Sequence, residues 1–206
     1  METDGIRWDL GELYAAPDDP AIERDLDDAA ASARAFEATW RGKIVGADAT
    51  SLLAAVRQYE RIHEVGGRPY FYSSLLTAAD TQDETAQRLE QRAREHWTEI
   101  RNLLLFFPLE IQAIPEERVR EVAGDATLAP YHYFLVQSRR FAPHTLSEPE
   151  EKILNQKALT SRAAFVQLFD ELSGSLRFEI EIEGERKLLT DAETMALLRS
   201  PRRDMR

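Results

Sequence analysis

Residues 19–40 read DPAIERDLDDAAASARAFEATW, and this stretch decides the fold class that most of the chain then repeats. Asp19 is a typical helix N-cap, and Pro20 suits the first helical position. Apolar residues then recur at alternating steps of four and three, which places them on one stripe of an amphipathic helix. They are Ile22, Leu26, Ala29, Ala33, Phe36 and Trp40. We therefore expect a helix that packs this stripe against other helices.

Further helices are expected on the C-terminal side of this segment. A second helix is predicted over about 50–65, because the glycine pair at 66–67 favours a helix end, and a third begins at about Arg68. A short link of this kind places the two helices antiparallel. The segment 83–107 has the apolar period of another helix, predicted to be the longest, which ends at Pro108.

The apolar period changes from helical to alternating near the C-terminal end. Short helices are expected over 115–123 and 128–140. In 178–182 apolar residues alternate with glutamates and Gly184 follows, so we expect a β-hairpin over about 177–189. The predicted fold class is therefore mainly α, an antiparallel helical array or bundle with one small β-hairpin near the C-terminus.

The length and composition suit a globular protein. The chain has 206 residues, of which 43% are hydrophobic, enough for one domain with a small annex. We divide it into an extended N-terminal segment at 1–17, a helical domain at 18–172, and a segment at 173–206. This last segment is expected to hold the hairpin and the start of further helices.

The charge is strongly acidic and excludes two classes of partner. The net charge of −11 opposes binding to nucleic acid and to anionic membrane surfaces. The chain has no cysteine, which excludes disulfides and thiolate metal sites. The N-terminus METDGIRWDL lacks the pattern of a secretory signal, so we expect a cytoplasmic protein.

The segment PHTLSEPEEKIL, residues 143–154, holds the most conspicuous polar cluster. Ser147 and Glu150 have the S-x-x-E spacing of a capping box, which predicts the start of a helix. A catalytic serine would need an orienting group and an oxyanion hole, and the surrounding sequence has no nucleophile motif. We interpret Ser147 and Glu150 as a structural cap and expect no catalytic residue here.

No metal-ligand motif is visible among the four histidines. HEVGG, residues 63–67, begins like the H-E-x-x-H zinc motif, but Gly67 occupies the place of the second histidine. Glu60 and His63 form one Glu-x-x-His pair, whereas a di-iron bundle site needs two pairs and two more glutamates. We therefore predict no catalytic, metal or cofactor residue in this chain.

Four tyrosines are candidate contacts for a peptide, because tyrosine offers both an apolar ring and a hydroxyl. They are Tyr70, Tyr72, Tyr131 and Tyr133. Core packing between helices is the alternative, and the helical spacing favours it.

Several segments together resemble the N-terminal region of the oligoendopeptidase F family, zinc metallopeptidases related to thimet oligopeptidase. They are RWDLGELY at 7–14, RGK at 41–43, PHTLSEPEEKIL at 143–154, FEIEIEGERKLLT at 178–190 and LLRSPRRDMR at 197–206. The resemblance covers essentially the whole chain in order. It implies a mostly helical fold around a deep channel, in which a zinc-activated water hydrolyses short peptides.

The resemblance places the catalytic apparatus outside this chain. Family members bind zinc through an H-E-x-x-H helix and a downstream glutamate, so zinc is expected only in the longer parent protein. The expected partners are the C-terminal catalytic domain of the same polypeptide and a short peptide substrate. The first functional hypothesis is thus a channel-wall domain that is inert alone. The alternative is a stand-alone helical module that binds a protein partner.

Overall fold

The computed structural model describes residues 8–203 and is mainly helical, as predicted. Its strands form a single two-stranded antiparallel sheet within these described residues. The chain divides into two compact units, residues 1–157 and 158–206. The first unit ends inside a helix, 15 residues before the boundary at 172 that we drew from the sequence. The three-part domain division therefore stays a prediction, and residues 1–7 of its first part lie outside the described residues.

The first helix forms as the sequence predicts. Helix α1 spans Pro20–Trp40, and the Asp19 carboxylate caps it by accepting from the Ala21 backbone N–H at 2.8 Å. The apolar stripe is buried at Ile22, Leu26, Ala29, Ala33 and Phe36. The exposed opposite face carries most of the charged residues, so the amphipathic pattern is satisfied.

The second helix corrects the prediction of two short helices separated by a glycine turn. Helix α2 spans Ala49–Ala79 without interruption, which makes it, at 31 residues, longer than the helix expected at 83–107. A Cβ atom at Gly66 would lie 2.9 Å from both the Ala29 Cβ and the Trp97 ring. Gly66 is therefore where neighbouring helices approach closely, and this packing outweighs the weak helix propensity of glycine.

The third helix begins and ends close to the predicted positions. Helix α3 spans Glu84–Leu104 and is capped by the Asp83 carboxylate, which accepts from two backbone N–H groups at 2.8 and 3.3 Å. Helix α4, Phe106–Ala113, follows after a break at Leu105. Pro108 lies in the first turn of α4, where a missing N–H costs little.

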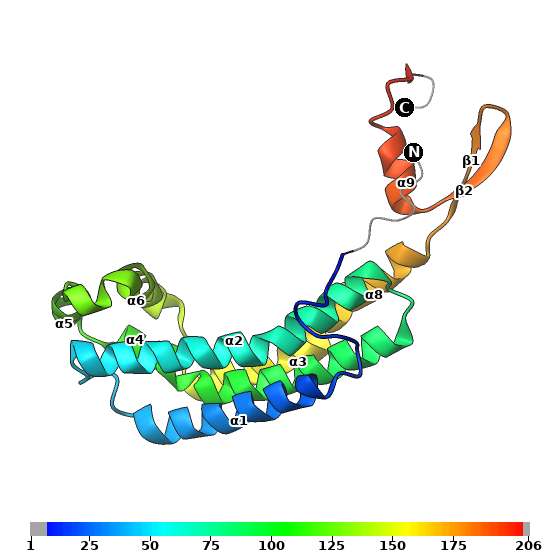
Figure 1. Ribbon diagram of the computed structural model, residues 1–206. Helices are drawn as coiled ribbons and strands as arrows, with labels where there is room; N and C mark the ends of the chain where they lie inside the picture. Colours follow the sequence, from blue (N-terminus) through cyan, green and yellow to red (C-terminus); the bar gives the residue numbers. More distant parts are fainter. Residues whose placement is uncertain (1–7, 204–206) are drawn as a thin grey trace. The chain divides into compact units, whose positions relative to one another are not determined.

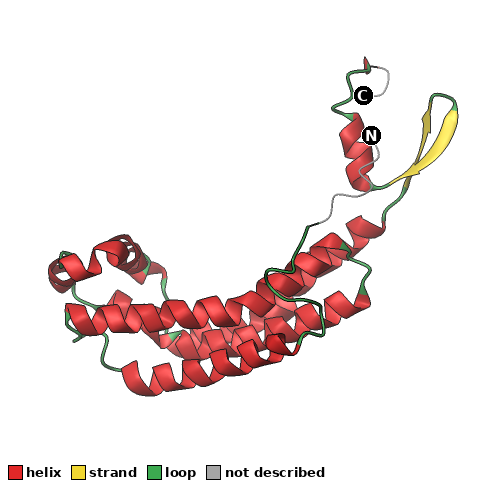
Figure 2. Cartoon of the chain, viewed as in Figure 1, coloured by secondary structure: helices red, strands yellow, loops and turns green. Residues whose placement is uncertain are grey.

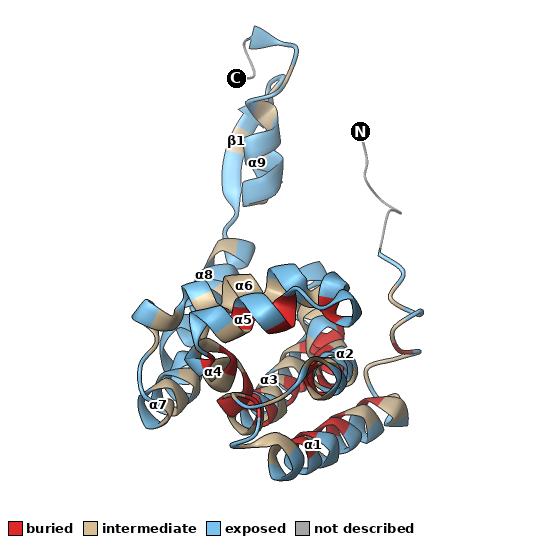
Figure 3. Ribbon diagram, turned by 90° about the vertical axis from the view of Figure 1, so that its left-hand side faces the viewer, coloured by how far each residue is buried: buried red, intermediate tan, exposed pale blue. Residues whose placement is uncertain are grey.

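Helices α1, α2 and α3 lie side by side, with α2 antiparallel to both α1 and α3 (Figure 1). Their buried faces and that of α4 turn towards one another (Figure 3). Phe36 is central to this core, because its ring lies 5.5 Å from that of Phe106 and 5.3 Å from that of Phe107. Both partner rings are essentially inaccessible to solvent.

Short helical segments complete the first unit. They are α5 at Glu116–Ala123, the 3₁₀ turn η1 at Ala126–Tyr131, α6 at His132–Arg140, the 3₁₀ turn η2 at Ala142–His144, and α7 at Glu148–Ala158. The predicted helix at 128–140 thus begins as a 3₁₀ turn that contains Pro130. Within residues 8–203, no helix combines the length and the apolar composition that a membrane crossing needs.

The second unit holds the predicted hairpin (Figure 2). It comprises a π-helical turn η3 at Leu159–Ala163, α8 at Ala164–Ser175, β1 at Phe178–Ile182, β2 at Glu185–Leu189 and α9 at Asp191–Leu197. The two-residue turn places Glu183 and Gly184 at positive φ, 57° and 82°. A complete capping box at Thr190 and Glu193 starts α9. None of the described residues of this unit is buried (Figure 3).

Candidate functional site

Two of the five segments that resemble the peptidase family, 41–43 and 143–154, meet at the C-terminal end of α1. Arg41 follows α1 and donates to both carboxylate oxygens of Glu148, the first residue of α7, at 2.9 and 3.0 Å. The same guanidinium donates to Glu37 and lies 4.7 Å from the centroid of the Phe106 ring. Residues 107 positions apart in the chain are thus joined by a bidentate ion pair.

Helix α4 supplies two further polar side chains at this junction. The Glu110 carboxylate accepts from the backbone N–H groups of Gly42 and Ile44, at 2.7 and 3.1 Å. The Thr145 hydroxyl donates to the Gln112 side-chain oxygen at 2.7 Å. We call five residues at this junction the junction cluster: Arg41, Glu110, Gln112, Thr145 and Glu148. No sequence signal identified Glu110 or Gln112, because their partners lie far away in the chain.

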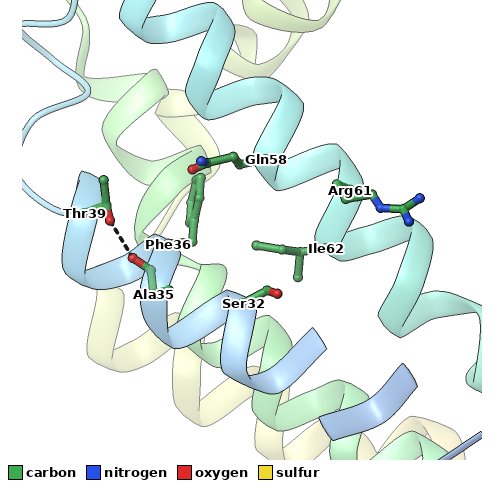
Figure 4. A pocket seen from close by; sticks show the side chains of 7 residues that line it. All are labelled: Ser32, Ala35, Phe36, Thr39, Gln58, Arg61 and Ile62. Carbon is green, nitrogen blue, oxygen red and sulfur yellow. Dashed lines mark hydrogen bonds between the residues drawn. The ribbon is translucent and has the colours of Figure 1, made fainter. Parts of the chain in front are cut away.

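The junction cluster borders an open hollow of about 430 Å³. Apolar side chains contribute to its lining, together with Glu110, Gln112, Thr145 and Glu148 from the cluster. A second hollow of about 240 Å³ lies between α1 and α2, where Phe36 and Ile62 face one another (Figure 4). Arg61 points away from these two side chains and pairs with Glu64 at 2.8 Å. In the first hollow, the Thr145 hydroxyl donates to the Gln112 side chain and the Phe141 carbonyl rather than to a carboxylate.

The charges of the junction cluster are mutually stabilised. The hydrogen bonds from Arg41 and then from Lys152 lower the pKa of Glu148 to about 2. The same contact with Glu148 raises the pKa of Arg41. Both groups therefore stay charged at neutral pH. The cluster holds the start of α7 against α1 and α4.

Ser147 and Glu150 lie at the start of α7, where the sequence placed a cap. Glu150 accepts from the Ser147 backbone N–H at 2.9 Å and from the Ser147 hydroxyl at 2.6 Å. These hydrogen bonds lower the pKa of Glu150. Glu150 thus supplies one half of the expected capping box, the bond from its carboxylate back to the Ser147 backbone N–H.

The four candidate tyrosines do not gather at one surface. Tyr72 is buried, with its ring 5.1 Å from that of Tyr14, and Tyr70 lies half-buried beside Phe71. The Tyr131 hydroxyl donates to Glu60 at 2.6 Å, and this bond raises its pKa. Tyr133 is 73% exposed. The contacts of Tyr72 are those of a core residue, and peptide binding by any of the four stays a prediction.

The histidines occupy separate environments. The His63 ring is hydrogen-bonded through Nδ1 to the Tyr59 carbonyl at 3.0 Å and packs 5.2 Å from the Trp97 ring. Burial lowers its pKa, which favours the neutral form. His132 contacts the Ala123 carbonyl at 2.9 Å. Among residues 8–203, no group of three or more histidine, aspartate or glutamate side chains has the arrangement of a metal site.

Comparisons with known proteins agree with the resemblance. Residues 110–178 match the family model described as Oligopeptidase F. Oligopeptidase PepF of Bacillus subtilis (strain 168) is 23% identical over 170 residues, which cover 81% of this chain and 25% of that protein. A crystal structure from Chlamydophila abortus, described as a peptidase, matches 96% of this chain and 33% of its own, with a TM-score of 0.51 and 21% identity.

The matched segment is similar to the N-terminal domain of a peptidase family, and the fold is mainly helical. Both the matched segment and the relative support a similarity to the N-terminal domain of the oligoendopeptidase F family. The chain spans about a quarter of the length of the curated relative that it matches. The structural match supports the fold alone.

Proposed function

We propose that this chain is the channel-wall domain of an oligoendopeptidase-F-like zinc metallopeptidase that hydrolyses short peptides. The match of residues 110–178 to the family model carries this proposal. The wall role is supported by the continuous helical array of α1 to α4, because packed helices make a rigid barrier that admits only short, unfolded peptides.

Zinc would activate the hydrolytic water in such an enzyme. The ligands that hold zinc are not among the motifs of this chain. His63 is half-buried against Tyr59 and Trp97, and the second histidine position is Gly67, which lies inside α2. These residues do not fit a zinc site. The chemistry is therefore assigned to the C-terminal catalytic part of a longer polypeptide, and the part described here restricts access.

A cleavage assay tests the proposal. The 206-residue chain should not hydrolyse a quenched fluorescent peptide, with or without added zinc. The whole polypeptide read from its gene should hydrolyse the peptide and lose this activity with a chelator. The control for this assay is the same whole polypeptide with the first histidine of its H-E-x-x-H segment changed to alanine, which should not hydrolyse the peptide. A reading frame that ends at Arg206 would instead support the stand-alone interaction module.

A further inference from the structure

The segment before α1 is fastened to the helices by one buried side chain. We call residues 8–19 the strap, and within it only Tyr14 is buried, with 4% of its surface exposed. Among residues 8–203, the backbone–backbone hydrogen bonds of the strap stay within it or reach the first turn of α1, as does the one from Ile22 to Asp19 at 3.0 Å. The strap is therefore held against α2 and α3 through side chains.

Tyr14 fills a pocket to which three helices contribute. Its ring lies 5.1 Å from the Tyr72 ring of α2, edge to face. The same buried cluster includes Ile22 and Leu26 of α1 and Leu89 of α3. This cluster is separate from the larger core that α1, α2 and α3 share with α4. The helices can therefore keep their main core when the Tyr14 ring leaves its pocket.

The pocket also supplies an acceptor for the phenol hydroxyl. The Tyr14 hydroxyl donates to the Asp25 carboxylate at 2.6 Å, and Arg68 of α2 donates to the same oxygen at 3.4 Å. Burial, and then the hydrogen bond to Asp25, raises the pKa of Tyr14, so the hydroxyl keeps its proton and remains a donor. An aromatic ring that carries a hydroxyl thus satisfies both the apolar walls and the carboxylate.

The other contacts that the structure shows for the strap are exposed or partly buried. One oxygen of the Asp19 carboxylate accepts from the Ala15 N–H at 3.1 Å and the other from the Ala21 N–H at 2.8 Å, which links the strap to the cap of α1. Leu10 and Leu13 are only partly buried against the cluster. Segments with few buried apolar side chains open locally at a low free energy. The strap can therefore open while the main core stays folded.

We propose that the strap is releasable and that the Tyr14 pocket is a binding site for a phenol ring, which the chain fills with its own tyrosine. When closed, the strap fastens α1, α2 and α3 to one another through this ring. When open, it leaves a pocket that selects ligands bearing a phenol, such as the tyrosine side chain of a peptide. Closing and ligand binding compete for one pocket, so the apparent affinity falls in proportion to the fraction of open molecules. The pocket shares no residue with the two hollows described above.

Hydrogen exchange measured by NMR tests whether the strap opens by itself. Relative to unstructured rates, the backbone amides of Tyr14, Ala15 and Asp19 should exchange at least about 100-fold faster than those of 52–62 in α2. Tyr14→Phe keeps the ring without its hydroxyl and should speed exchange of the strap about fivefold, because the bond to Asp25 is lost. Tyr14→Ala removes the anchor and should speed it at least about 20-fold. Tyr133→Ala removes an exposed ring and is the matched control, which should leave exchange unchanged.

A titration with p-cresol, which is the tyrosine side chain without its backbone, tests the pocket. Added to Tyr14→Ala and followed by NMR at the methyl groups of Leu26 and Leu89, p-cresol should bind saturably. The wild type should bind it at least about tenfold more weakly, because its own tyrosine competes. Toluene lacks the hydroxyl and should bind Tyr14→Ala at least about fivefold more weakly than p-cresol, since the Asp25 carboxylate then receives no phenol donor.

Four results would overturn the proposal. Strap amides that exchange only together with those of 52–62 would make the strap part of the main core. Loss of helicity in Tyr14→Ala, measured by circular dichroism, would mean that the helices need the strap to fold. Failure of p-cresol to bind Tyr14→Ala would mean that no pocket remains when the ring is removed. Equal binding of toluene and p-cresol would mean that the hydroxyl is not recognised.

Discussion

The two compact units of this chain use the same kind of amphipathic helix with opposite outcomes. Helix α1 buries its stripe, in which Phe36 is only 2% exposed, whereas Phe169 in the stripe of α8 is 68% exposed. The spacing of apolar residues is equally regular in both, and the stripe of α8 consists of Phe165, Leu168, Phe169, Leu172 and Leu176. Helix α1 has α2 and α3 beside it, whereas the described residues of the unit of α8 add a π-helical turn, a hairpin and a short helix. Apolar periodicity therefore predicts a helix and its apolar face, while a neighbour decides whether that face stabilises the fold.

The largest expected effect contrasts one phenylalanine from each unit. Phe107→Ala removes a fully buried ring that packs against Phe36 and Tyr59, and should lower the free energy of unfolding by about 3–5 kcal/mol. Phe169→Ala removes an exposed ring and should change it by less than about 0.5 kcal/mol. Urea denaturation of both variants measures the difference. Equal losses would show that the second unit has a core of its own.

The next effect concerns the ion pair of the junction cluster. Glu148→Gln should lower the free energy of unfolding by about 2 kcal/mol at pH 7, because the carboxylate receives a bidentate, partly shielded guanidinium. Glu64→Gln is the matched control, since the Arg61–Glu64 pair is exposed and should contribute at most about 0.5 kcal/mol. Urea is the denaturant of choice, because guanidinium chloride is a salt and would screen the ion pair.

The same pair gives a pH dependence with a defined sign. The pKa of Glu148 is about 2 in the folded chain against an ordinary value of 4.5, so the unfolded state binds the proton more tightly. Its contribution is complete above pH 4.5 and is lost as the pH falls towards 2. The stability difference between the wild type and Glu148→Gln should therefore shrink over that range. A difference that stays constant down to pH 2.5 would contradict the ion pair.

A smaller effect separates two adjacent glycines in α2. Gly66→Ala should destabilise the chain by about 1–2 kcal/mol, because the new methyl group would lie 2.9 Å from Ala29 and Trp97. Gly67→Ala would meet only the Phe71 ring at 3.4 Å, and should stabilise α2 by about 0.5–1 kcal/mol through its better helix propensity. Thermal unfolding of the pair measures both signs. Stabilisation by both alanines would contradict the close approach of α1 and α3 to α2.

The smallest effect compares the helix caps of the two units. Ser147→Ala should cost at most about 1 kcal/mol, because the hydroxyl bond to Glu150 is lost at the start of α7. Thr190→Ala breaks the complete capping box of α9, but should leave the main unfolding transition unchanged within about 0.3 kcal/mol. Hydrogen exchange at 191–197 should nevertheless become faster. A shift of the main transition by Thr190→Ala would mean that α9 unfolds together with the core.

The fold was largely predictable from local patterns. The boundaries of α1 follow from its cap and period, and the hairpin follows from alternation around Gly184. The prediction failed at Gly66, since a glycine that ends a helix and a glycine that lets helices approach look alike in one sequence. Only the positions of Ala29 and Trp97, 37 and 31 residues away, distinguish the two cases.

The candidate site was much less predictable than the fold. The contact between Ser147 and Glu150 was predictable, because the two residues lie three positions apart. The Arg41–Glu148 pair spans 107 residues, and nothing local to either residue indicates the other. The tyrosine contacts proposed for a peptide depend on the placement of whole helices, which apolar periodicity does not supply. Tyr72 illustrates this, since its partner is Tyr14 in the segment before α1.

Zinc content of the 206-residue chain tests the central claim most directly, namely that this is a peptidase domain without the metal centre. The chain is incubated with excess zinc, dialysed and measured by elemental mass spectrometry, with the whole polypeptide treated in the same way. The account predicts less than about a tenth of an equivalent in the 206-residue chain and about one equivalent in the whole polypeptide. One equivalent retained by the 206-residue chain, and lost in His63→Ala, would contradict the account and identify this domain as a metal-binding unit.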